Sequence, residues 1–364
     1  MKIKELTAKF EEYAPLSYQE SYDNCGMQVG TPEAEIRGVL LTLDITEGVI
    51  DEAIAKGCNL IIAHHPLIFR GVKKIIGRDH IERCIIKAIK NDVAIYASHT
   101  NMDKMKNGVS ARLAQKIGLK DLEILVPEQN CLFKIVTFVP TASAAFVRQT
   151  LFEAGAGTIG KYDRCSYSIN GEGTFRAGND CHPFVGAIGE EHHEEEVRIE
   201  TIIKKEHLSR AIKALLAVHP YEDPAYDIYE LKNEHKEAGL GIIGNLPEET
   251  ELLSYLKMVK EKLQVGAIRY TEPPKKKIKR VALCGGSGSE FVQNAIAKGA
   301  DLYISGDFKY HDLFNAENII TIADVGHFES EQFTKEIFFE IVSKNNPKFA
   351  IQFSDYKTNP INYI

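Results

Sequence analysis

The sequence predicts an α/β core of two pseudo-symmetric halves, each containing a strand-helix-strand (βαβ) unit, interrupted by an α+β insert. Three observations predict this fold. Short apolar runs alternate with amphipathic helical stretches, two distant segments repeat one another, and the middle of the chain has a different order of strands and helices. A chain of 364 residues also exceeds the usual size of a single core, so more than one domain is expected.

The internal repeat defines the two halves. Residues 39–65 align without a gap on residues 281–307. Each segment has a strand, a helix that ends at a glycine, and a second strand followed by polar residues, which is the pattern of a βαβ unit. Only the first copy keeps a pair of histidines after its second strand. The aligned positions there are His64 with Gly306 and His65 with Asp307.

The histidine pair is the first candidate metal-binding feature. His64 and His65 follow the apolar run 59–62, and Pro66 ends the predicted strand. Two adjacent imidazoles at a strand end can point at two different positions, which suits two metal ions better than one. A pair of surface or supporting histidines is the alternative, and the pair taken alone does not decide between them.

Two other apolar runs also end in residues of the kinds that bind metals. His99 and Asp103 follow one of them, and His327 and Glu331 follow the other. The last two are four residues apart at the start of an amphipathic stretch, so they share one helical face. Because ligands bind at the carboxyl ends of strands in an open α/β sheet, these groups are expected to converge on a metal site rather than to form unrelated surface clusters.

Four separated motifs along the chain resemble a known family. They are residues 22–30, His64-His65-Pro66, the segment from His99 to Asp103, and the segment from Gly326 to Glu331. In this order they are similar to the GTP cyclohydrolase I type 2 homologues, a family described by its dinuclear metal centre and toroidal hexamer. The resemblance covers residues 1 to about 125 and about 235 to 364. One departure is Tyr22, where the family usually has Trp.

The resemblance implies two divalent metal ions per subunit and a ring-shaped homohexamer, with the metal sites facing an interior cavity. It places His99 beside the ions as a supporting residue. The implied metal ligands are His64, His65, Asp103, His327 and Glu331.

This set of ligands has chemical consequences of its own. Three imidazoles and two carboxylates carry a charge of −2 against +4 from two divalent ions, so the site would attract anions or hold a hydroxide. Five side chains cannot saturate two ions, which leaves positions for water or substrate. Glu331 is the best candidate for a bridging carboxylate. The ligand types favour Zn, Mn, Fe, Co or Ni over Ca, without choosing among the five metals.

The middle of the chain is predicted to be a separate insert, from residue 126 to residue 234, between core segments 1–125 and 235–364. Its order of strand, helix, two strands, helix and strand is ferredoxin-like. In longer members of the family the corresponding insert is PII/CutA-like, and residues 219–224 are the best match to it. The expected elements are 131–140, 142–154, 162–169, 197–203, 208–218 and 225–231.

Three other polar or glycine-rich runs have competing interpretations. Residues 190–196 are expected to be a solvated loop rather than a metal site. His219 and Glu222 are expected to lie in a turn fixed by two prolines, with a regulatory ligand site as the alternative. Residues 285–288 are expected to form a tight turn near the crevice, with contact to a substrate phosphate as the alternative.

The composition excludes several classes of protein. The net charge is −7, so a nucleic-acid partner is not expected, and no segment is apolar enough to span a membrane. The basic run 273–280 is predicted to be a solvated approach to an edge strand. The seven cysteines lack paired spacing, which is typical of a reducing compartment. No signal-peptide core is present, and a cytoplasmic protein is expected.

Two functions are compatible with these observations. The first is a metal-dependent hydrolase that uses a metal-bridged water on a nucleotide-like or other anionic small molecule, with His99 or Asp44 as the catalytic group that handles a proton or orients substrate. The family name implies opening of a GTP ring, but a fold and a name do not establish a substrate. The second is a non-catalytic metal-binding scaffold or sensor that acts through its oligomer and its PII-like insert.

Overall fold

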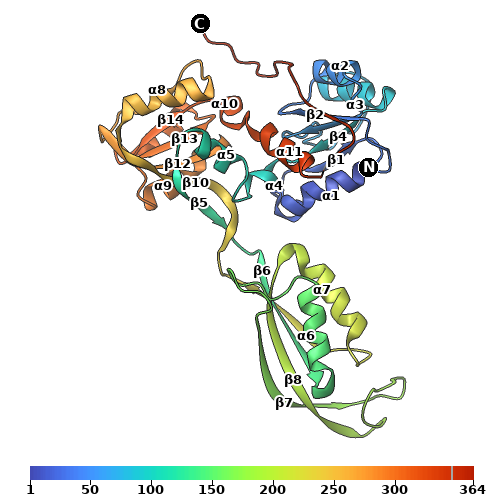
Figure 1. The fold of residues 1–364 in the computed structure, drawn as a ribbon. Helices are drawn as coiled ribbons and strands as arrows, with labels where there is room; N and C mark the ends of the chain where they lie inside the picture. Colours follow the sequence, from blue (N-terminus) through green and yellow to red (C-terminus); the bar gives the residue numbers. More distant parts are fainter. Residues whose placement is uncertain (346) are drawn as a thin grey trace. The chain divides into compact units, whose positions relative to one another are not determined.

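The computed structural model describes residues 1–345 and 347–364, and these form two compact units (Figure 1). The core unit comprises Met1–Pro127 and Lys236–Ile364, and the inserted unit comprises Glu128–His235. The sheets contain both parallel and antiparallel strands, which confirms the mixed α/β fold predicted from the sequence. Within the described residues, no helix combines the length and apolar character needed to cross a membrane.

The first sheet of the core unit has the strand order β1-β4-β3-β2-β15. Strands β4, β3, β2 and β15 run parallel, and β1 pairs antiparallel with β4. The three central strands are buried along their whole length, as expected for parallel strands that are covered on both faces. The strands are β1 (Gly26–Val29), β2 (Gly38–Thr42), β3 (Leu60–Ala63), β4 (Ala94–Ala97) and β15 (Ala350–Phe353).

Helices cover both faces of this sheet. Val39 and Leu41 of β2 pack with α1 and α11, whereas Leu40 packs with α2 and α3, because successive residues of a strand point to opposite faces. The side chain of Thr46 accepts a hydrogen bond from the backbone of Val49 and so caps the start of α2. The helices are α1 (Ile3–Tyr13), α2 (Glu47–Ala55), α3 (His80–Lys90) and α11 (Thr334–Ser343).

The second sheet of the core unit has the order β11-β14-β13-β12-β10-β5. Its central strands β12, β13 and β14 run parallel, while β10 and β11 pair antiparallel with their neighbours. The strands are β5 (Lys120–Glu128), β10 (His235–Glu251), β11 (Arg269–Tyr270), β12 (Lys277–Ser287), β13 (Leu302–Gly306) and β14 (Thr321–Asp324).

This second sheet is also covered on both faces. Leu283 packs with α5 and α8, and its neighbour Ala282 packs with α9 and the 3-10 helix η4 on the other side. These helices are α5 (Val109–Lys116), α8 (Leu252–Leu263), α9 (Val292–Ala297) and η4 (Tyr310–Ala316). The remaining short helices of the core unit are η1 (Leu16–Tyr18), α4 (Thr100–Asp103), η3 (Ser289–Phe291) and α10 (His327–Glu331).

The two copies of the sequence repeat form corresponding parts of the two sheets. The first copy is β2-α2-β3 and the second is β12-α9-β13, and the two strands of each copy pair in parallel. A third parallel strand follows in each sheet, and a short helix carrying polar residues comes after it. That helix is α4 after β4 in the first sheet and α10 after β14 in the second.

The inserted unit is a four-stranded antiparallel sheet of order β7-β8-β6-β9 with two helices. Its own core includes Ile135 and Ile199 from the sheet, Leu151 from α6 and Leu215 from α7. Its elements follow one another as β6 (Leu132–Pro140), η2 (Thr141–Ser143), α6 (Ala144–Glu153), β7 (Ser166–Arg176), β8 (Glu191–Lys204), α7 (Lys205–Val218) and β9 (Tyr226–Leu231).

Two local predictions were wrong. Residues 191–196, expected to be a loop, form the first part of β8 and pair with residues 171–176 of β7. The polar run tolerates this because five of those six residues lie on an exposed or half-exposed part of the hairpin and only Glu196 is buried. Residues 285–287, expected to lie in a turn, are the last residues of β12, and the tight segment begins only at Gly288.

Candidate metal centre

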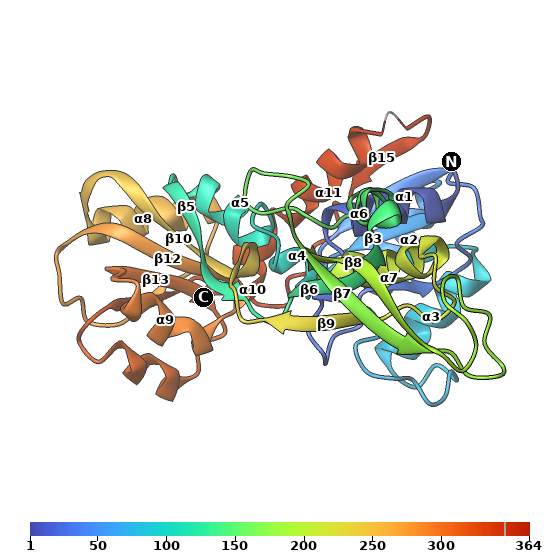
Figure 2. The same cartoon turned by 90° about the horizontal axis from the view of Figure 1, so that it is seen from below.

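Polar side chains from the two sheets of the core unit meet where the parallel strands end. His64 and His65 follow β3, and His99 follows β4, immediately before α4. His327 and Glu331 are the first and last residues of α10, which follows β14. Helices α4 and α10 lie between the two sheets in both views (Figure 1, Figure 2). The carboxyl ends of strands are where an open α/β sheet places its ligands, so the arrangement agrees with that rule.

Glu331 lies at the centre of the cluster, and its two carboxylate oxygens face different partners. Oε2 is 2.9 Å from His65 Nε2 and 3.0 Å from His327 Nε2. Oε1 is 3.7 Å from His64 Nε2, and Asp103 Oδ1 lies 3.5 Å from the same nitrogen. The five side chains therefore form two groups that share one carboxylate. One group is His65, His327 and Glu331, and the other is His64, Asp103 and Glu331.

Oxygen acceptors orient four histidines from their Nδ1 side. His64 Nδ1 is 2.9 Å from the carbonyl oxygen of Ser98, which can only accept, so this nitrogen carries the proton. The other three Nδ1 atoms donate to carboxylates, and in each case Nε2 is left facing the cluster. Those pairs are His65 with Asp44 at 2.7 Å, His327 with Asp307 at 2.7 Å, and His99 with Asp23 at 2.9 Å.

The charges of the two groups differ. Burial lowers the pKa of His64, so its imidazole is neutral at pH 7. Burial acts in the same direction on His65 and His327, but it is outweighed. Hydrogen bonds to Asp44 and Glu331 raise the pKa of His65 to about 9, and hydrogen bonds to Asp307 and Glu331 raise the pKa of His327 to about 11.

The two carboxyl groups at the centre also have opposite pKa shifts. Burial and the nearby Glu331 raise the pKa of Asp103 well above its ordinary value. Burial would do the same to Glu331, but the surrounding histidines outweigh it and hold the pKa of Glu331 well below its ordinary value. Burial and the neighbouring charges thus shift the pKa values of these two carboxyl groups in opposite directions within a single buried cluster.

Two unpaired atoms test whether a metal fits this cluster. His64 Nε2 and Asp103 Oδ1 are fully buried, and neither has a hydrogen-bond partner. Buried polar atoms normally have partners, because an unpaired one loses its hydration without compensation. Both are lone-pair donors that point into the cluster, and His64 Nε2 has no proton to give. A cation bound by these two atoms and Glu331 would satisfy both of them, so the donor set fits a metal ion.

Asp23 is a member of the site that the sequence did not identify. Its side chain is fully buried and accepts hydrogen bonds from His99 Nδ1 at 2.9 Å, from the backbone of Thr100 at 3.0 Å and from the Thr100 hydroxyl at 2.5 Å. Burial would raise the pKa of Asp23, but His99 and the side chains of Thr100 and Cys25 lower it. Asp23 belongs to the motif of residues 22–30, which is a signal in the sequence. Its contact with His99 could not be predicted, because the two residues are 76 positions apart in the chain.

The remaining predicted residues have different positions. Asp44 does not face the centre, and it holds His65 through Oδ1 while Oδ2 accepts from the Thr358 hydroxyl at 2.6 Å. His99 joins His64 and His65 in a third group of possible ligands. His219 is bound to backbone on both sides, with Nε2 donating to the Phe138 carbonyl and Nδ1 accepting from the Tyr221 backbone. Residues 190–196 contribute to no such group within the part of the chain that the structure describes.

An exposed aromatic edge adjoins His99. The Tyr22 and Phe69 rings are 6.2 Å apart between centroids, and the Phe69 ring is 6.2 Å from that of His99. Tyr22 is 64% exposed and Phe69 is 40% exposed. Large apolar side chains left in contact with water beside a polar cluster provide a surface on which a planar group can stack.

Comparison with known proteins gives full-length matches. The family model described as Duf34/NIF3 (NGG1p interacting factor 3) matches residues 1–360. The Bacillus subtilis protein named GTP cyclohydrolase 1 type 2 homolog is 37% identical over 366 residues, which cover 99% of this chain and 98% of the relative. The Halalkalibacterium halodurans protein of the same name is 39% identical over 360 residues, 98% of this chain and 97% of the relative.

Solved structures match over the same length. A Bacillus cereus protein related to NIF3 has a TM-score of 0.83 and 39% identity, covering 100% of this chain and 99% of the other. A Staphylococcus aureus protein has a TM-score of 0.80 and 31% identity with the same coverage.

Proposed function

This chain belongs to the Duf34/NIF3 family, and on that premise we propose that it is a metal-dependent hydrolase with two divalent ions that share Glu331. The observation that carries the proposal is the division of the cluster into two groups around one carboxylate. Each group offers three ligand atoms, and two oxygens of one carboxylate placed between two ions form a common bridge. His64 and Asp103 would complete one ion position, and His65 and His327 the other.

Three protein ligands per ion leave coordination positions open, which is the mark of a catalytic rather than a structural metal site. When bound, the ions would supply Lewis acidity, making water a better nucleophile at neutral pH and polarising a carbonyl or phosphoryl oxygen of the substrate. We keep Zn, Mn, Fe, Co and Ni as candidates because imidazole and carboxylate ligands suit all five.

His99 is the candidate for moving a proton in this reaction. Asp23 accepts the hydrogen bond of its Nδ1 and so fixes the orientation of the ring, which leaves Nε2 free to accept a proton from water or substrate and return it later. We assign Asp44, the other catalytic candidate, the role of orienting His65, because it binds the far side of that imidazole. The Tyr22 and Phe69 edge beside His99 suits a substrate with a planar ring, which is compatible with the GTP named for the relatives.

A second candidate function is binding without catalysis, in which the metal centre reports metal supply. The observation that favours it is the inserted unit, which has its own core and its own cavity and contributes nothing to the metal cluster in the described residues. In this function, the inserted unit would communicate metal binding at the core to the other subunits of an oligomer. The hydrolase remains the preferred function because of the open coordination and the Asp23-His99 pair.

The first experiment measures metal per subunit by elemental mass spectrometry. We expect two ions in the wild type, about one in His65→Ala, and fewer than one in Glu331→Ala because this residue serves both positions. His193→Ala is the matched control, since His193 is exposed in the inserted unit and should leave both ions. A metal content that neither core substitution changes would overturn the ligand assignment.

Activity separates the two functions. GTP is the first substrate to test, followed by other nucleotides, with the metal-loaded protein. In the hydrolase, His99→Ala should keep both ions and lose about 100-fold or more in turnover, the range expected for a general acid-base residue. A fully loaded wild type that turns over none of these compounds would favour the binding function instead.

We also propose that residues 126–234 form an inserted PII/CutA-like domain and that the protein assembles as a cytoplasmic homohexamer. The chain order of the insert, β-α-β-β-α-β, supports the first part. Expression of residues 128–235 alone tests it, and a cooperative thermal transition is the expected result. Light scattering tests the second part against a subunit mass of 40.7 kDa, and a monomer in solution would refute it.

A further inference from the structure

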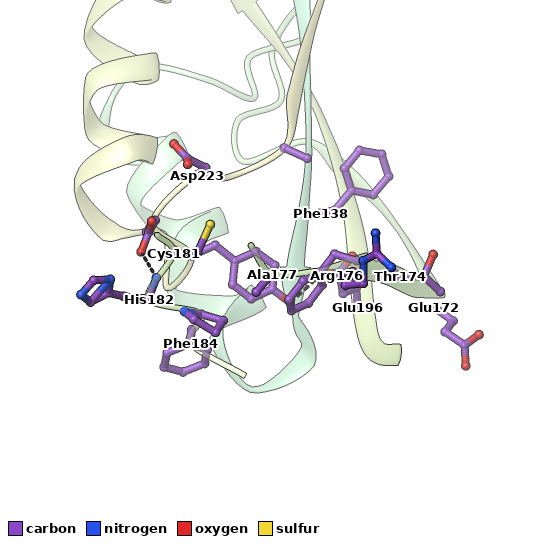
Figure 3. Close-up of a pocket in the computed structure, with 16 residues that line it drawn as sticks. Phe138, Glu172, Thr174, Arg176, Ala177, Cys181, His182, Phe184, Glu196 and Asp223 are labelled. Atoms are coloured by element: carbon purple, nitrogen blue, oxygen red, sulfur yellow. Dashed lines mark hydrogen bonds between the residues drawn. The ribbon is translucent and has the colours of Figure 1, made fainter. Parts of the chain in front are cut away.

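The inserted unit contains a cavity of about 470 Å³ that is separate from the metal centre. It lies between the end of β7, the following segment 177–184 and the turn 221–225, with one residue each from β6 and β8. In Figure 3, Phe138, Arg176 and Glu196 lie on one side of the cavity, and Cys181, His182 and Phe184 lie on the other. This volume is within the range of cavities that hold small molecules.

Aromatic rings line much of this cavity. The Tyr221 ring is 6.0 Å from that of Phe175 and 6.4 Å from that of Phe184, and both pairs are tilted. Phe138 adds a fourth ring from β6. Phe184 is 59% exposed, so a large apolar surface is in contact with water at the edge of the cavity. Rings tilted against one another around one space present both faces and edges to its contents, and a ring face attracts positive charge.

The charged residues that line the cavity are mostly acidic. Four carboxylates and one guanidinium take part, and His182 is the only other titratable nitrogen in the lining. The acidic residues are Glu172, Glu196, Glu222 and Asp223, and the basic residue is Arg176. This excess of negative charge attracts a cation and repels an anion.

Glu196 is the most informative of these carboxylates, because it is only 9% exposed. Its Oε1 accepts a hydrogen bond of 2.8 Å from the Tyr221 hydroxyl, and no described lysine, arginine or histidine forms an ion pair with it. Gly173 on β7 leaves room for the carboxylate, since a Cβ there would lie 2.3 Å from Glu196 Oε2. A buried carboxylate normally has a cationic partner, and here the cavity is the place where one can bind.

The polar groups at the turn are already positioned. His219 holds the backbone of Tyr221 with a hydrogen bond of 3.2 Å, and Glu222 accepts one of 2.9 Å from the backbone of His182. The aromatic and acidic walls are therefore preformed, which lowers the entropic cost of binding. A metal ion does not fit this cavity, because no three ligand atoms of the described inserted unit lie close enough together to bind one.

We propose that this cavity binds a small aromatic cation, such as a protonated aryl or heterocyclic amine. The ring of the ligand packs against Phe175, Phe184 and Tyr221, and its positive charge lies near Glu196. Cation-π attraction and the buried carboxylate both select for positive charge, and the size of the cavity limits the ligand to one or two rings. This site is independent of the metal centre and of the proposed hydrolase activity.

The test is a ligand-observed NMR titration of the full-length protein with benzyltrimethylammonium, and with benzoate and benzyl alcohol as anionic and neutral comparators. We expect benzyltrimethylammonium to bind with a Kd of about 1 mM or lower, a reasonable value for a ligand of this size. Glu196→Gln keeps an acceptor for Tyr221 but removes the charge, so it should weaken binding of the cation about tenfold. Neither comparator should bind as well as the cation.

Two further variants keep the test decisive. Glu195→Gln makes the same change at the next residue of β8, on the opposite, exposed side of the strand, and should leave the Kd unchanged. Phe184→Ala removes an exposed ring without opening the core, so it should weaken binding severalfold even if Glu196→Gln does not fold. No binding of the cation, equal binding of a comparator, or an unchanged Kd in a folded Glu196→Gln protein would each overturn the proposal.

Discussion

The two halves of the core unit share three parallel strands and a following short helix, yet they supply different groups to the candidate metal centre. In the first half, β3 ends at the histidine pair and α4 provides Asp103. In the second half, β13 ends at Gly306, which Asp307 follows, and α10 provides both His327 and Glu331. The repeat thus keeps the framework, but the proposed ligands of the first half come from a strand end and a helix, and those of the second half come from a helix alone.

The packing of α10 explains why the second half has no histidine pair at its strand end. A Cβ on Gly306 would lie 2.7 Å from the backbone nitrogen of His327 and 2.8 Å from the carbonyl carbon of Gly326. Those contacts are with backbone, which cannot rotate away as a side chain can. Any side chain at position 306, which aligns with His64 in the repeat, would therefore displace α10 together with His327 and Glu331. The second half thus cannot carry a histidine pair at this strand end as the first half does.

The largest expected effect comes from filling this space. Gly306→Ala should lower the free energy of unfolding of the core by about 1–3 kcal/mol, the range for overpacking, and should reduce metal content by displacing His327. Urea denaturation and elemental analysis measure the two effects. Gly71→Ala is the control, because nothing lies within 4 Å of the added Cβ there. A Gly306→Ala protein that unfolds at the wild-type urea concentration would contradict this account of the asymmetry.

A second comparison concerns the carboxylates that accept hydrogen bonds from Nδ1 of His65 and His327, which are Asp44 and Asp307. Asp44→Asn and Asp307→Asn each keep an acceptor for Nδ1 but remove the charge that makes the imidazole a stronger ligand. Each should weaken the binding of one ion by about 10–100-fold. The effect should be larger for Asp44, whose side chain is 32% exposed against 50% for Asp307.

Calorimetric titration with the chosen metal measures both affinities. Asp51→Asn serves as the control because Asp51 is exposed and, among the described residues, forms its ion pair with Lys87. If both variants bound the ions as the wild type does, the carboxylates would have no part in preparing the ligands.

The pH dependence of metal binding should also differ between the two groups. At pH 7.5 the raised pKa values of His65, about 9, and His327, about 11, keep both imidazoles protonated in the metal-free protein. A metal must displace these protons, so binding to this group releases about two protons and strengthens as the pH rises. His64 has a lowered pKa and is already neutral, so metal binding to the group of His64, Asp103 and Glu331 should release fewer protons.

Calorimetry in buffers of different ionisation enthalpy counts the released protons. In His64→Ala, which retains only the group of His65 and His327, affinity should rise by up to about 100-fold per pH unit between pH 6 and 8. A constant affinity across that range would show that neither imidazole is protonated before the metal binds.

The smallest expected effect concerns the hydroxyl that supports Asp44. Thr358→Val removes the 2.6 Å hydrogen bond to Asp44 Oδ2 but keeps the shape of the side chain. Metal affinity should fall only about threefold to tenfold, less than in Asp44→Asn, because the carboxylate keeps its charge and its bond to His65. A loss as large as that of Asp44→Asn, in the same titration, would mean that Thr358 fixes the position of the whole group.

Much of the candidate site could be predicted from the sequence because its local signals are strong. The histidine pair, His99 and His327 all follow apolar runs, and strands of this kind present their carboxyl ends to ligands. The polar run 190–196 could not be read in the same way, because it forms a strand only by pairing with β7. Local hydrophobic periodicity does not detect an exposed hairpin strand that lacks an apolar face.

By itself the sequence determined the α/β class, the repeat and the residue types that can bind a metal, because these depend on short-range pattern and side-chain chemistry. Only the tertiary structure decided which groups act together. Glu331 lies 266 residues from His65, and Asp23 lies 76 residues from His99. The first contact arises from packing two sheets with α4 and α10 between them, and the second arises from the pairing of β1 with β4 within one sheet. A contact made by packing distant segments leaves no trace in local periodicity, whereas its distances and orientations set the chemistry of the site.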